Sequence, residues 1–377
     1  MKVLHVYSGN LYGGVERFLA TLARERAAAP EMEPAFALCF EGPLARELRE
    51  AGAPVEILGA VRASRPWTVL SASAALRRLL ERDHPDVALF HSVWPLALLG
   101  GAVPGPRALF LHDAVSPHWT TALARRRRPG LVLCNSNHVA ATARGPFAGA
   151  TVHTSPLAVT QPPLPAGFDR AAVRRSLGVQ DPTEVVLLIA ARLERWKGHR
   201  LLLTALARLA AGTRWRCWIA GGAQRPSEHT YLRELEALAS APGLSGRVHF
   251  LGQRGDVPRL MAAADLHCQP NESPEPFGIA FVEAMSSGLP VVTTALGGAL
   301  EVVPPSAGLL VPPDATALST ALASLIASPE RRAELGAAGA RHAASAFAPA
   351  RRLPDLAAQL AAFSALPRTA RAGYPPP

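Results

Sequence analysis

Two glutamates in one continuous stretch, ESPEPFGIAFVEAMSSGLPVVTT at 272–294, have the type and spacing to bind a ligand rich in hydroxyl groups. Glu275 and Glu283 are separated by seven residues, and Gly278 lies between them where a loop is predicted to turn into a helix. Carboxylates at such a corner can accept hydrogen bonds from a sugar at one end and a ribose at the other. Taken singly, either glutamate could instead be a helix cap or a surface charge. The backbone N–H groups predicted at the helix start, which suit an anion or a hydroxyl, belong to Phe277, Gly278 and Ile279.

A pair of cations is predicted at another corner between a strand and a helix. Arg192 and Lys197 lie in ARLERWKGH at 191–199, directly after the apolar run EVVLLIAAR. Two cations there could clamp a diphosphate, assisted by the dipole of the following helix. Of the 39 lysines and arginines, only Lys2 and Lys197 are lysines, so this chain otherwise uses arginine almost throughout. A compact ammonium at position 197 is therefore unusual for this chain. The alternative is a chance lysine on a surface turn.

The first half of the chain has weaker candidates. Gly13 and Gly14, in GNLYGGVERF after the first apolar run, could let the backbone approach a ligand as the next helix opens. His112, in FLHDA, is predicted at the carboxyl end of a strand, and His91, in FHSVW, has the same kind of position on the preceding strand. Either histidine could instead be a buried structural residue.

Several common catalytic signatures are absent from the sequence. It contains no GxxxxGK[ST], GxGxxG, HExxH or GxSxG motif, and no DxD pair of the kind that holds a divalent metal in many sugar transferases. We therefore expect that protein groups alone neutralise a bound diphosphate, without a metal.

The elements that must position these residues follow an α/β pattern, in which short apolar runs alternate with segments of helical period. The alternation stops in the proline-rich stretch 155–169 and then restarts, so we expect two doubly wound Rossmann-like domains facing across a cleft. The predicted organisation is a first domain at 1–160 rejoined by a helix at 348–365, a linker and lead-in at 161–182, a second domain at 183–347, and a flexible tail at 366–377. The predicted strands lie at 2–8, 34–40, 54–59, 86–92, 107–114, 131–137, 151–156, 184–192, 214–222, 247–252, 264–270, 290–295 and 308–313, with helices such as 14–28 and 68–82 between them.

Composition limits the class of protein. The chain has 377 residues, 49% of them apolar and 18% charged, which is typical of globular domains, and no run of ~18 apolar residues could cross a membrane. The start MKVLHVYSGN has no signal-peptide pattern, so we expect a cytoplasmic protein whose four cysteines stay reduced. The net charge of +10 is densest at Arg125–Arg128, which could be a solvated helix end or a contact with an anionic membrane at the inner face of the plasma membrane. No aromatic residues interleave with that run, so a nucleic-acid partner is not expected.

These motifs together resemble the retaining GT-B glycosyltransferases of family four. The resemblance extends in order from about residue 2 to residue 347 and includes IAGG at 219–222 and VHFLG at 248–252. It implies a second domain that binds a nucleotide-sugar donor and a first domain that binds the acceptor. Arg192 and Lys197 would hold the diphosphate, and Glu283 would bind the ribose. The resemblance also implies that His112 and Glu275 are catalytic residues, together with Arg192 and Lys197. The remaining donor contacts that it implies involve Gly13, Gly14, Gly221, Gly252, Phe277, Gly278 and Ile279.

The resemblance also implies a reaction. A sugar would move with retention from a nucleoside-diphosphate sugar, a UDP-sugar in preference to a GDP-sugar, to a sugar, a lipid-linked or a small-molecule acceptor, in cell-surface polysaccharide or glycoconjugate synthesis. Two departures from the family pattern stand out: Gly221-Gly222-Ala223 replaces a spaced Gly-x-Gly, and residues 269–271 replace a proline-serine pair. The alternatives are a nucleotide-sugar epimerase of the same fold and a non-catalytic scaffold subunit.

Overall fold

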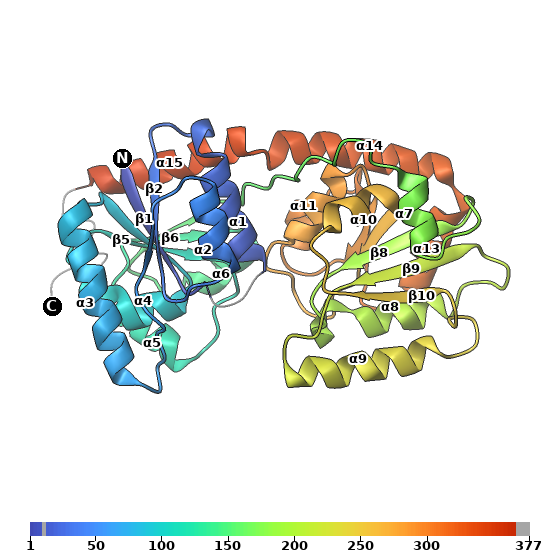
Figure 1. Cartoon of the computed structure of the whole chain (residues 1–377), viewed down its shortest axis with the longest axis horizontal. Coiled ribbons are helices and arrows are strands. Elements are labelled where there is room, and N and C mark those ends of the chain that lie inside the picture. Colours follow the sequence, from blue (N-terminus) through green and yellow to red (C-terminus); the bar gives the residue numbers. More distant parts are fainter. Residues whose placement is uncertain (10–12, 367–377) are drawn as a thin grey trace. The chain divides into compact units, whose positions relative to one another are not determined.

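The computed structural model describes residues 1–9 and 13–366 and divides the chain into two compact units. The first unit comprises Met1–Val159 and the chain from Phe347 onward, and the second comprises Thr160–Ala346. Each unit contains one parallel sheet, and helices cover both faces of that sheet (Figure 1).

The first unit is built on a seven-stranded sheet with the order β3-β2-β1-β4-β5-β6-β7. Its strands are β1 (Lys2–Tyr7), β2 (Glu33–Leu38), β3 (Val55–Ile57), β4 (Val87–His91), β5 (Arg107–Leu111), β6 (Leu131–Cys134) and β7 (Thr151–Thr154). Its helices are α1 (Gly14–Arg24), α2 (Pro43–Glu50), α3 (Pro66–Asp83), α4 (Val93–Leu99), α5 (Trp119–Arg126), α6 (Asn137–Ala143) and α15 (Pro349–Ala365), with short 3₁₀ turns η1 (Arg26–Ala28) and η2 (Gly100–Ala102).

The second unit has a six-stranded sheet with the order β10-β9-β8-β11-β12-β13. Its strands are β8 (Val185–Ala190), β9 (Trp215–Ala220), β10 (Val248–Gly252), β11 (Leu266–Gln269), β12 (Val291–Thr294) and β13 (Gly308–Val311). Its helices are α7 (Arg170–Ser176), α8 (His199–Leu206), α9 (Pro226–Ala239), α10 (Val257–Ala263), α11 (Ile279–Ser286), α12 (Ala299–Val302), α13 (Ala315–Ala327) and α14 (Pro329–Ala346), and a 3₁₀ turn, η3 (Arg195–Lys197), precedes α8.

Both sheets are doubly wound, as the alternating pattern predicted. The strand order reverses between β1 and β4 in the first sheet and between β8 and β11 in the second. Such sheets bind ligands at this switch point, beyond the carboxyl ends of the strands. Because helices cover both faces, the central strands are apolar throughout: β8, with the sequence VVLLIA, buries its first five residues.

Two stretches differ in detail from the sequence prediction. The predicted helix at 14–28 ends at Arg24 and continues as the 3₁₀ turn η1. The predicted linker and lead-in at 161–182 contains α7, whose start is capped by the Asp169 side chain. The Arg174 guanidinium of α7 is buried and lies 2.8 Å from the Asp265 carboxylate, which ties this helix to the second unit.

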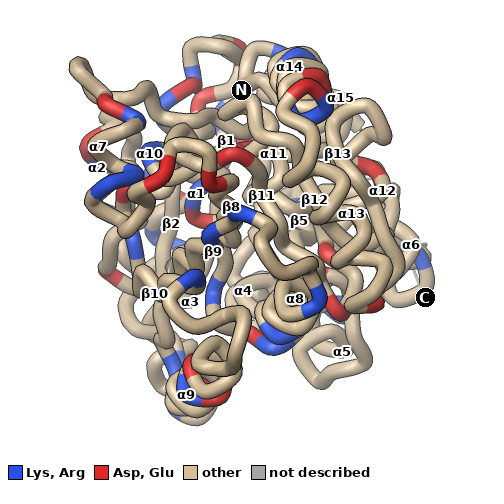
Figure 2. Tube along the Cα trace, turned by 90° about the vertical axis from the view of Figure 1, so that its right-hand side faces the viewer, with Lys and Arg blue, Asp and Glu red and all other residues tan. Residues whose placement is uncertain are grey.

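Charged residues of both signs share the same helices, as Figure 2 shows along α9. The arginine run at 125–128 is not uniform, because Arg127 turns back and donates a hydrogen bond from Nε to the Ala97 carbonyl near the end of α4, at 3.0 Å. Arg125, Arg126 and Arg128 are exposed. All four cysteines are buried and form no disulfide, as expected. Among residues 1–9 and 13–366, no helix combines the length and the apolar character needed to cross a membrane.

Candidate active site

One carboxylate oxygen organises the switch point of the second sheet. Glu275 Oε2 accepts hydrogen bonds from Lys197 Nζ at 2.8 Å, Asn271 Nδ2 at 2.6 Å and Gln269 Nε2 at 3.2 Å. The Glu275 side chain is 8% exposed and that of Lys197 is 14% exposed. Three donors on one oxygen fix the carboxylate in a single orientation. No hydrogen bond from any described residue reaches Oε1, which stays available for a ligand hydroxyl.

The backbone around Glu275 is held by the loop that follows β12. Glu275 pairs with Gly297 in a parallel bridge, and the Gly298 N–H donates to the Glu275 carbonyl at 2.6 Å. Gly297 has a φ of +63°, and a Cβ there would lie 2.6 Å from the Glu275 carbonyl oxygen. Only glycine permits this approach, so the loop backbone determines where the carboxylate lies.

The two predicted cations lie together beyond β8, and each already has a partner. Arg192 forms an ion pair with Glu194 at 3.0 Å, and its side chain is 37% exposed. Lys197, at the end of η3, lies over the Trp196 ring, with Nζ 3.8 Å from the ring centroid. The Trp196 indole donates to Glu194 at 3.1 Å. The ammonium is therefore held between an aromatic face and a carboxylate, and the more exposed guanidinium can exchange partners easily.

Glycines bring the neighbouring strand ends into contact. Gly198, the N-cap of α8, has a φ of +76°, and a Cβ on it would lie 1.8 Å from the Pro270 carbonyl oxygen. The Gly221 N–H donates to the Gly252 carbonyl at 2.9 Å, and a Cβ on Gly221 would lie 1.9 Å from the Ala191 carbonyl oxygen. The carboxyl ends of β8, β9 and β10 thus converge. Gly221, Gly252 and Arg192 therefore line the same edge of the second sheet.

Helix α11 begins where the sequence predicted a helix start. Gly278 is its N-cap in the left-handed conformation, with a φ of 98°. Ile279 is the first helical residue, and Phe277 precedes the cap, so the amides of Gly278 and Ile279, rather than that of Phe277, point from the first turn. Glu283 is a buried residue of this helix, 5% exposed. The first amides of α11 therefore come only a few residues after Glu275 in the chain, as the loop-to-helix pattern predicted.

Sequence reasoning missed four side chains of this arrangement: Glu194, Trp196, Gln269 and Asn271. Gln269 and Asn271 were noted only as a departure from a family pattern, yet both donate to Glu275. Their position at the end of β11, next to β8 in the sheet, was the signal that could have identified them.

In the first unit, His112 is the residue that follows β5, and its side chain is 6% exposed. Its Nε2 lies 3.0 Å from His91 Nδ1. Burial lowers the pKa of His112 to about 3, so the ring is neutral at physiological pH. His91 is the last residue of β4 and is fully buried.

The glycine pair before α1 has a more limited role than expected. The Gly13 N–H already donates to Glu16 Oε2 at 2.9 Å, and Glu16 Oε1 accepts from the Tyr7 hydroxyl at 2.8 Å. Gly14 is the first residue of α1. The Gly13 N–H is therefore already bonded to the Glu16 side chain, and Gly14 remains the candidate for contact with a ligand. The residues 10–12 of this loop lie outside the described part of the chain.

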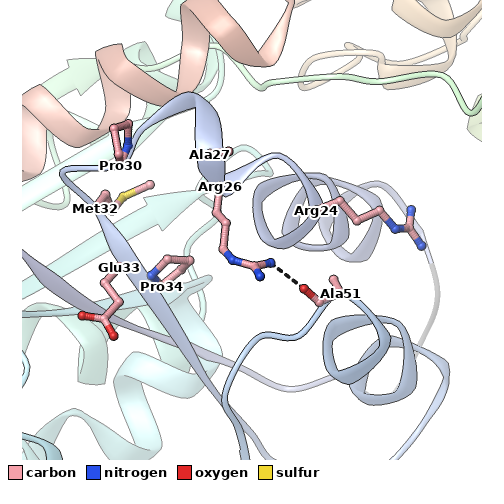
Figure 3. Close-up of a pocket in the computed structure, with 8 residues that line it drawn as sticks. All are labelled: Arg24, Arg26, Ala27, Pro30, Met32, Glu33, Pro34 and Ala51. Carbon is pink, nitrogen blue, oxygen red and sulfur yellow. Dashed lines mark hydrogen bonds between the residues drawn. The ribbon is translucent and has the colours of Figure 1, made fainter.

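A cavity of about 540 Å³ lies at the edge of the first sheet opposite to His112 and Gly14. Figure 3 shows residues from η1 and the start of β2 around it, with Arg26 donating to the Ala51 carbonyl. Glu33 and Pro34, at the start of β2, place the cavity at the amino end of the strands, whereas doubly wound sheets bind ligands at the carboxyl ends. None of the candidate residues lines it.

Comparison with known proteins shows which family the second unit resembles. The family model described as "Glycosyl transferases group 1" matches residues 170–342, within the second unit. The second unit is therefore similar to members of this family. The prediction made from Glu275, Glu283, Arg192 and Lys197 is thereby confirmed at the level of the family, since all four residues lie in the matched range.

Relatives and solved structures of the group 1 glycosyltransferases extend the comparison. A GDP-mannose-dependent monoacylated alpha-(1-6)-phosphatidylinositol monomannoside mannosyltransferase of Corynebacterium glutamicum is 34% identical over 183 residues, 46% of each chain. A D-inositol 3-phosphate glycosyltransferase of Rhodococcus opacus is 36% identical over 184 residues, 46% of this chain and 40% of its own. The chain thus spans less than half the length of these curated relatives. The crystal structure of Anabaena Alr3699/HepE in complex with UDP and glucose matches with a TM-score of 0.82 and 25% identity, over 96% of this chain and 100% of the other. The predicted fold class, two Rossmann-like parallel sheets of the GT-B type, is confirmed.

A metal centre is a separate question. Among residues 1–9 and 13–366, no three histidine, cysteine, aspartate or glutamate side chains gather in a way that could hold a metal ion. The carboxylate with the largest number of side-chain donors at the candidate site, Glu275, is turned toward an ammonium and two amides. Such a donor set suits hydroxyl and phosphate ligands.

Proposed function

We propose that the chain is a retaining, metal-independent glycosyltransferase that moves a sugar from a nucleoside-diphosphate sugar to a hydroxyl acceptor. We place it in the synthesis of cell-surface polysaccharides or glycoconjugates. The observation that carries the proposal is the hydrogen-bonded cluster of Lys197, Asn271 and Gln269 around Glu275 Oε2 at the switch point of the second sheet. This cluster orders a cation and a carboxylate where such sheets bind ligands.

In this proposal the second unit binds the donor. Arg192 and Lys197 hold the diphosphate, which can share or displace their present acidic partners Glu194 and Glu275. Glu275 Oε1 accepts from a hydroxyl of the donor sugar, and Glu283 binds the ribose hydroxyls. The backbone also contributes, through the amides of Gly278 and Ile279 and the strand ends at Gly221 and Gly252.

The chemistry follows from the charge that develops on the leaving group. As the bond from the sugar to the phosphate breaks, negative charge grows on the phosphate oxygens. Cations and helix N–H groups that are already in place stabilise this charge more than they stabilise the ground state. Retention requires the acceptor to attack from the face of the departing phosphate, which then removes the acceptor's proton. We propose that no covalent glycosyl-enzyme intermediate forms on Glu275.

The first unit binds the acceptor in this proposal, and Gly14 and His112, at the carboxyl edge of its own sheet, contact the donor. Sugars, lipid-linked sugars and small molecules are the acceptor classes we consider. We further propose action in the cytoplasm, with contact to an anionic membrane surface through the exposed Arg125, Arg126 and Arg128. Arg127 is excluded from this contact, because it is bonded to the Ala97 carbonyl.

We propose a UDP-sugar in preference to a GDP-sugar. The matching crystal structure in complex with UDP and glucose covers 96% of this chain, whereas the relative named for GDP-mannose is matched over 46% of it. The base is read by contacts outside the cluster around Glu275. The cluster itself therefore does not distinguish the two donors.

The experiment that tests the proposal is thermal unfolding against a panel of nucleoside diphosphates and their sugars, with and without EDTA. A ligand at 100 times its Kd adds about 2.7 kcal/mol of stability, a readily visible shift. We expect one nucleotide to stabilise the protein equally with and without EDTA, and proton NMR of the product to show the donor's anomeric configuration. Stabilisation lost in EDTA contradicts the metal-independent clamp. Stabilisation by no nucleotide favours the scaffold, and conversion of the donor without acceptor favours the epimerase.

A further inference from the structure

Three histidines form a continuous line of hydrogen bonds across the switch point of the first sheet. His5 Nδ1 lies 2.9 Å from His91 Nε2, and His91 Nδ1 lies 3.0 Å from His112 Nε2. Neighbouring rings are nearly parallel, with interplanar angles of 20° and 22°. The line begins inside β1, crosses the last residue of β4 and ends just after β5, so it leads from the middle of the sheet to its carboxyl edge.

The line is enclosed by aromatic rings. Phe36 of β2 stacks on His5 at 5.1 Å between centroids, and Phe110 stacks on His112 at 4.6 Å. Phe18 of α1 covers the other end, 6.2 Å from His91 and 5.7 Å from His112. His5 and His91 are fully buried, and burial holds the pKa of His5 at about 3 and that of His91 well below its usual range. All three rings are therefore neutral at physiological pH.

Neutral rings allow only two arrangements of protons. Each neutral imidazole has one N–H and one bare nitrogen, so every N–H in the line must point the same way. In one arrangement His5 donates to His91 and His91 donates to His112, which leaves the His112 proton on Nδ1. In the other arrangement every bond is reversed, and the His5 proton lies on Nε2.

The two free ends of the line differ in their surroundings. Among the described residues, neither His5 Nε2 nor His112 Nδ1 has a hydrogen-bond partner, and both atoms are buried. His5 is fully buried in the middle of the sheet, whereas His112 is 6% exposed at the carboxyl edge. A buried N–H without an acceptor is costly, so the proton is better placed at the end that lies at the carboxyl edge, where such sheets bind ligands. The surroundings therefore favour protons that point from His5 toward His112.

We propose that His5 and His91 are positioning residues that fix His112 as the tautomer protonated on Nδ1, so that this N–H donates to an oxygen of a ligand at the carboxyl edge. The oxygen belongs to a sugar hydroxyl or to a phosphate. The inference of a ligand rests on the proposed function, whereas the tautomer rests on the line of histidines alone. A neutral ring with a fixed proton orients a ligand oxygen, and it neither takes up nor releases a proton.

The tautomer is measured directly by ¹⁵N NMR of the imidazole nitrogens in the full-length wild-type protein near neutral pH. We expect a protonated Nδ1 and a bare Nε2 on His112, and the same pattern on His91. A proton on His112 Nε2 overturns the proposal whether or not the protein transfers sugar. Conversely, the expected tautomer in a protein without transferase activity leaves the line intact and contradicts only the proposed function.

Variants separate positioning from packing. His91→Phe keeps an aromatic ring but removes both hydrogen bonds, and we expect His112 to become a mixture of tautomers. His91→Asn keeps an amide donor near the place of Nδ1 and should restore the Nδ1-protonated form at least in part. His267→Phe is the matched control, because His267 is a fully buried strand histidine whose ring nitrogens have no partner among the described residues. An unchanged His112 tautomer in His91→Phe contradicts the positioning role.

The ligand is tested with two probes added separately to the wild-type protein, glucose and inorganic phosphate. Donation from Nδ1 shifts the Nδ1–H signal of His112 when the matching oxygen binds. A shift with glucose alone identifies a hydroxyl as the acceptor, and a shift with phosphate alone identifies an anion. If the signal stays in place at saturating amounts of both probes, the donor role toward a ligand is wrong.

Discussion

Lys197 and Glu275, 78 positions apart in the sequence, form an ion pair with Nζ 2.8 Å from Oε2. Both side chains are largely buried, so the ammonium attracts the carboxylate with little screening by water. The proposed sites for the donor diphosphate and for the donor sugar are therefore coupled before any ligand binds. A change at one residue should alter what the other can hold.

Lys197→Ala tests this coupling. We expect a loss of at least about 2 kcal/mol of transition-state stabilisation, roughly a thirtyfold fall in kcat/KM, and a comparable loss for Arg192→Ala. Lys197→Ala should also lower the free energy of unfolding by ~1–3 kcal/mol, because it leaves Glu275 with only its two amide donors. The measurements are steady-state kinetics with the donor found by thermal unfolding, and urea unfolding.

The matched control is Arg195→Ala, in the same 3₁₀ turn. Arg195 pairs with Glu234 at 2.6 Å, but the two side chains are 61% and 40% exposed. An exposed pair contributes about 0–1 kcal/mol, so this variant should retain near wild-type turnover and stability. Equal losses in Arg195→Ala and Lys197→Ala contradict a specific role for Lys197.

Asn271→Leu removes one of the two amides that hold Glu275. The Asn271 amide lies 2.6 Å from Glu275 Oε2, and Asn271 is 1% exposed. With leucine of similar size, the carboxylate loses a donor and can rotate, so we expect weaker binding of the donor sugar, seen as a higher Kd for the nucleotide sugar. The Kd for the nucleoside diphosphate without its sugar should change little. Calorimetric titration measures both constants, and an equal loss for the two ligands contradicts the assignment of Glu275 to the sugar.

The fold could be predicted from the sequence because its signals are local. Each parallel strand, buried on both faces, is a short apolar run such as VVLLIA in β8. The turn from loop to helix is marked in the sequence by Gly278. The positions of Arg192, Lys197 and Glu275 beyond strand ends followed from the same alternation. These signals place residues on elements, and the doubly wound topology then brings the elements together.

The interactions at the site could not be predicted, because they join distant parts of the chain. Nothing local shows that Lys197 pairs with Glu275, or that Gln269 and Asn271 turn toward the same oxygen. His5 looks like any residue of an apolar strand, and only the order β1-β4-β5 places it in line with His91 and His112. The sequence therefore predicts a role for each residue separately, whereas the structure shows which of these residues contact one another.

Gly198→Ala tests the close approach of the Lys197 turn to the loop after β11. Gly198 has a φ of +76°, and an added Cβ would lie 1.8 Å from the Pro270 carbonyl oxygen. Gly243 has a similar φ of +85° with open space around it, so Gly243→Ala has the backbone strain alone, about 1–2 kcal/mol. We expect Gly198→Ala to lower the free energy of unfolding well beyond Gly243→Ala and to weaken nucleotide binding. Chemical unfolding compares the two, and equal losses contradict the predicted contact.

Acid should destabilise the protein through its buried histidines. Burial lowers the pKa to about 3 for His5 and His112 and to about 4 for His199 and His267, against an ordinary value of 6.5. Between these values the unfolded chain binds protons that the folded chain does not, so stability is full above pH 6.5 and falls as the pH drops toward 4. Each such histidine contributes a slope of about 1.4 kcal/mol per pH unit in that window.

The change that isolates one of these slopes is His267→Phe. His267 lies in β11, and its ring contacts Phe281 at 6.1 Å between centroids, while no residue in the described part of the chain forms a hydrogen bond with either ring nitrogen. Removing its ionisable ring should reduce the pH slope of the unfolding free energy of the second unit by about 1.4 kcal/mol per unit between pH 6 and pH 5. Urea unfolding at pH 7.5, 6 and 5 measures the slope, which is independent of any constant change in stability from the new side chain. A slope equal to that of the wild type means that His267 takes up its proton without unfolding, and burial of the neutral ring is then not what makes the protein sensitive to acid.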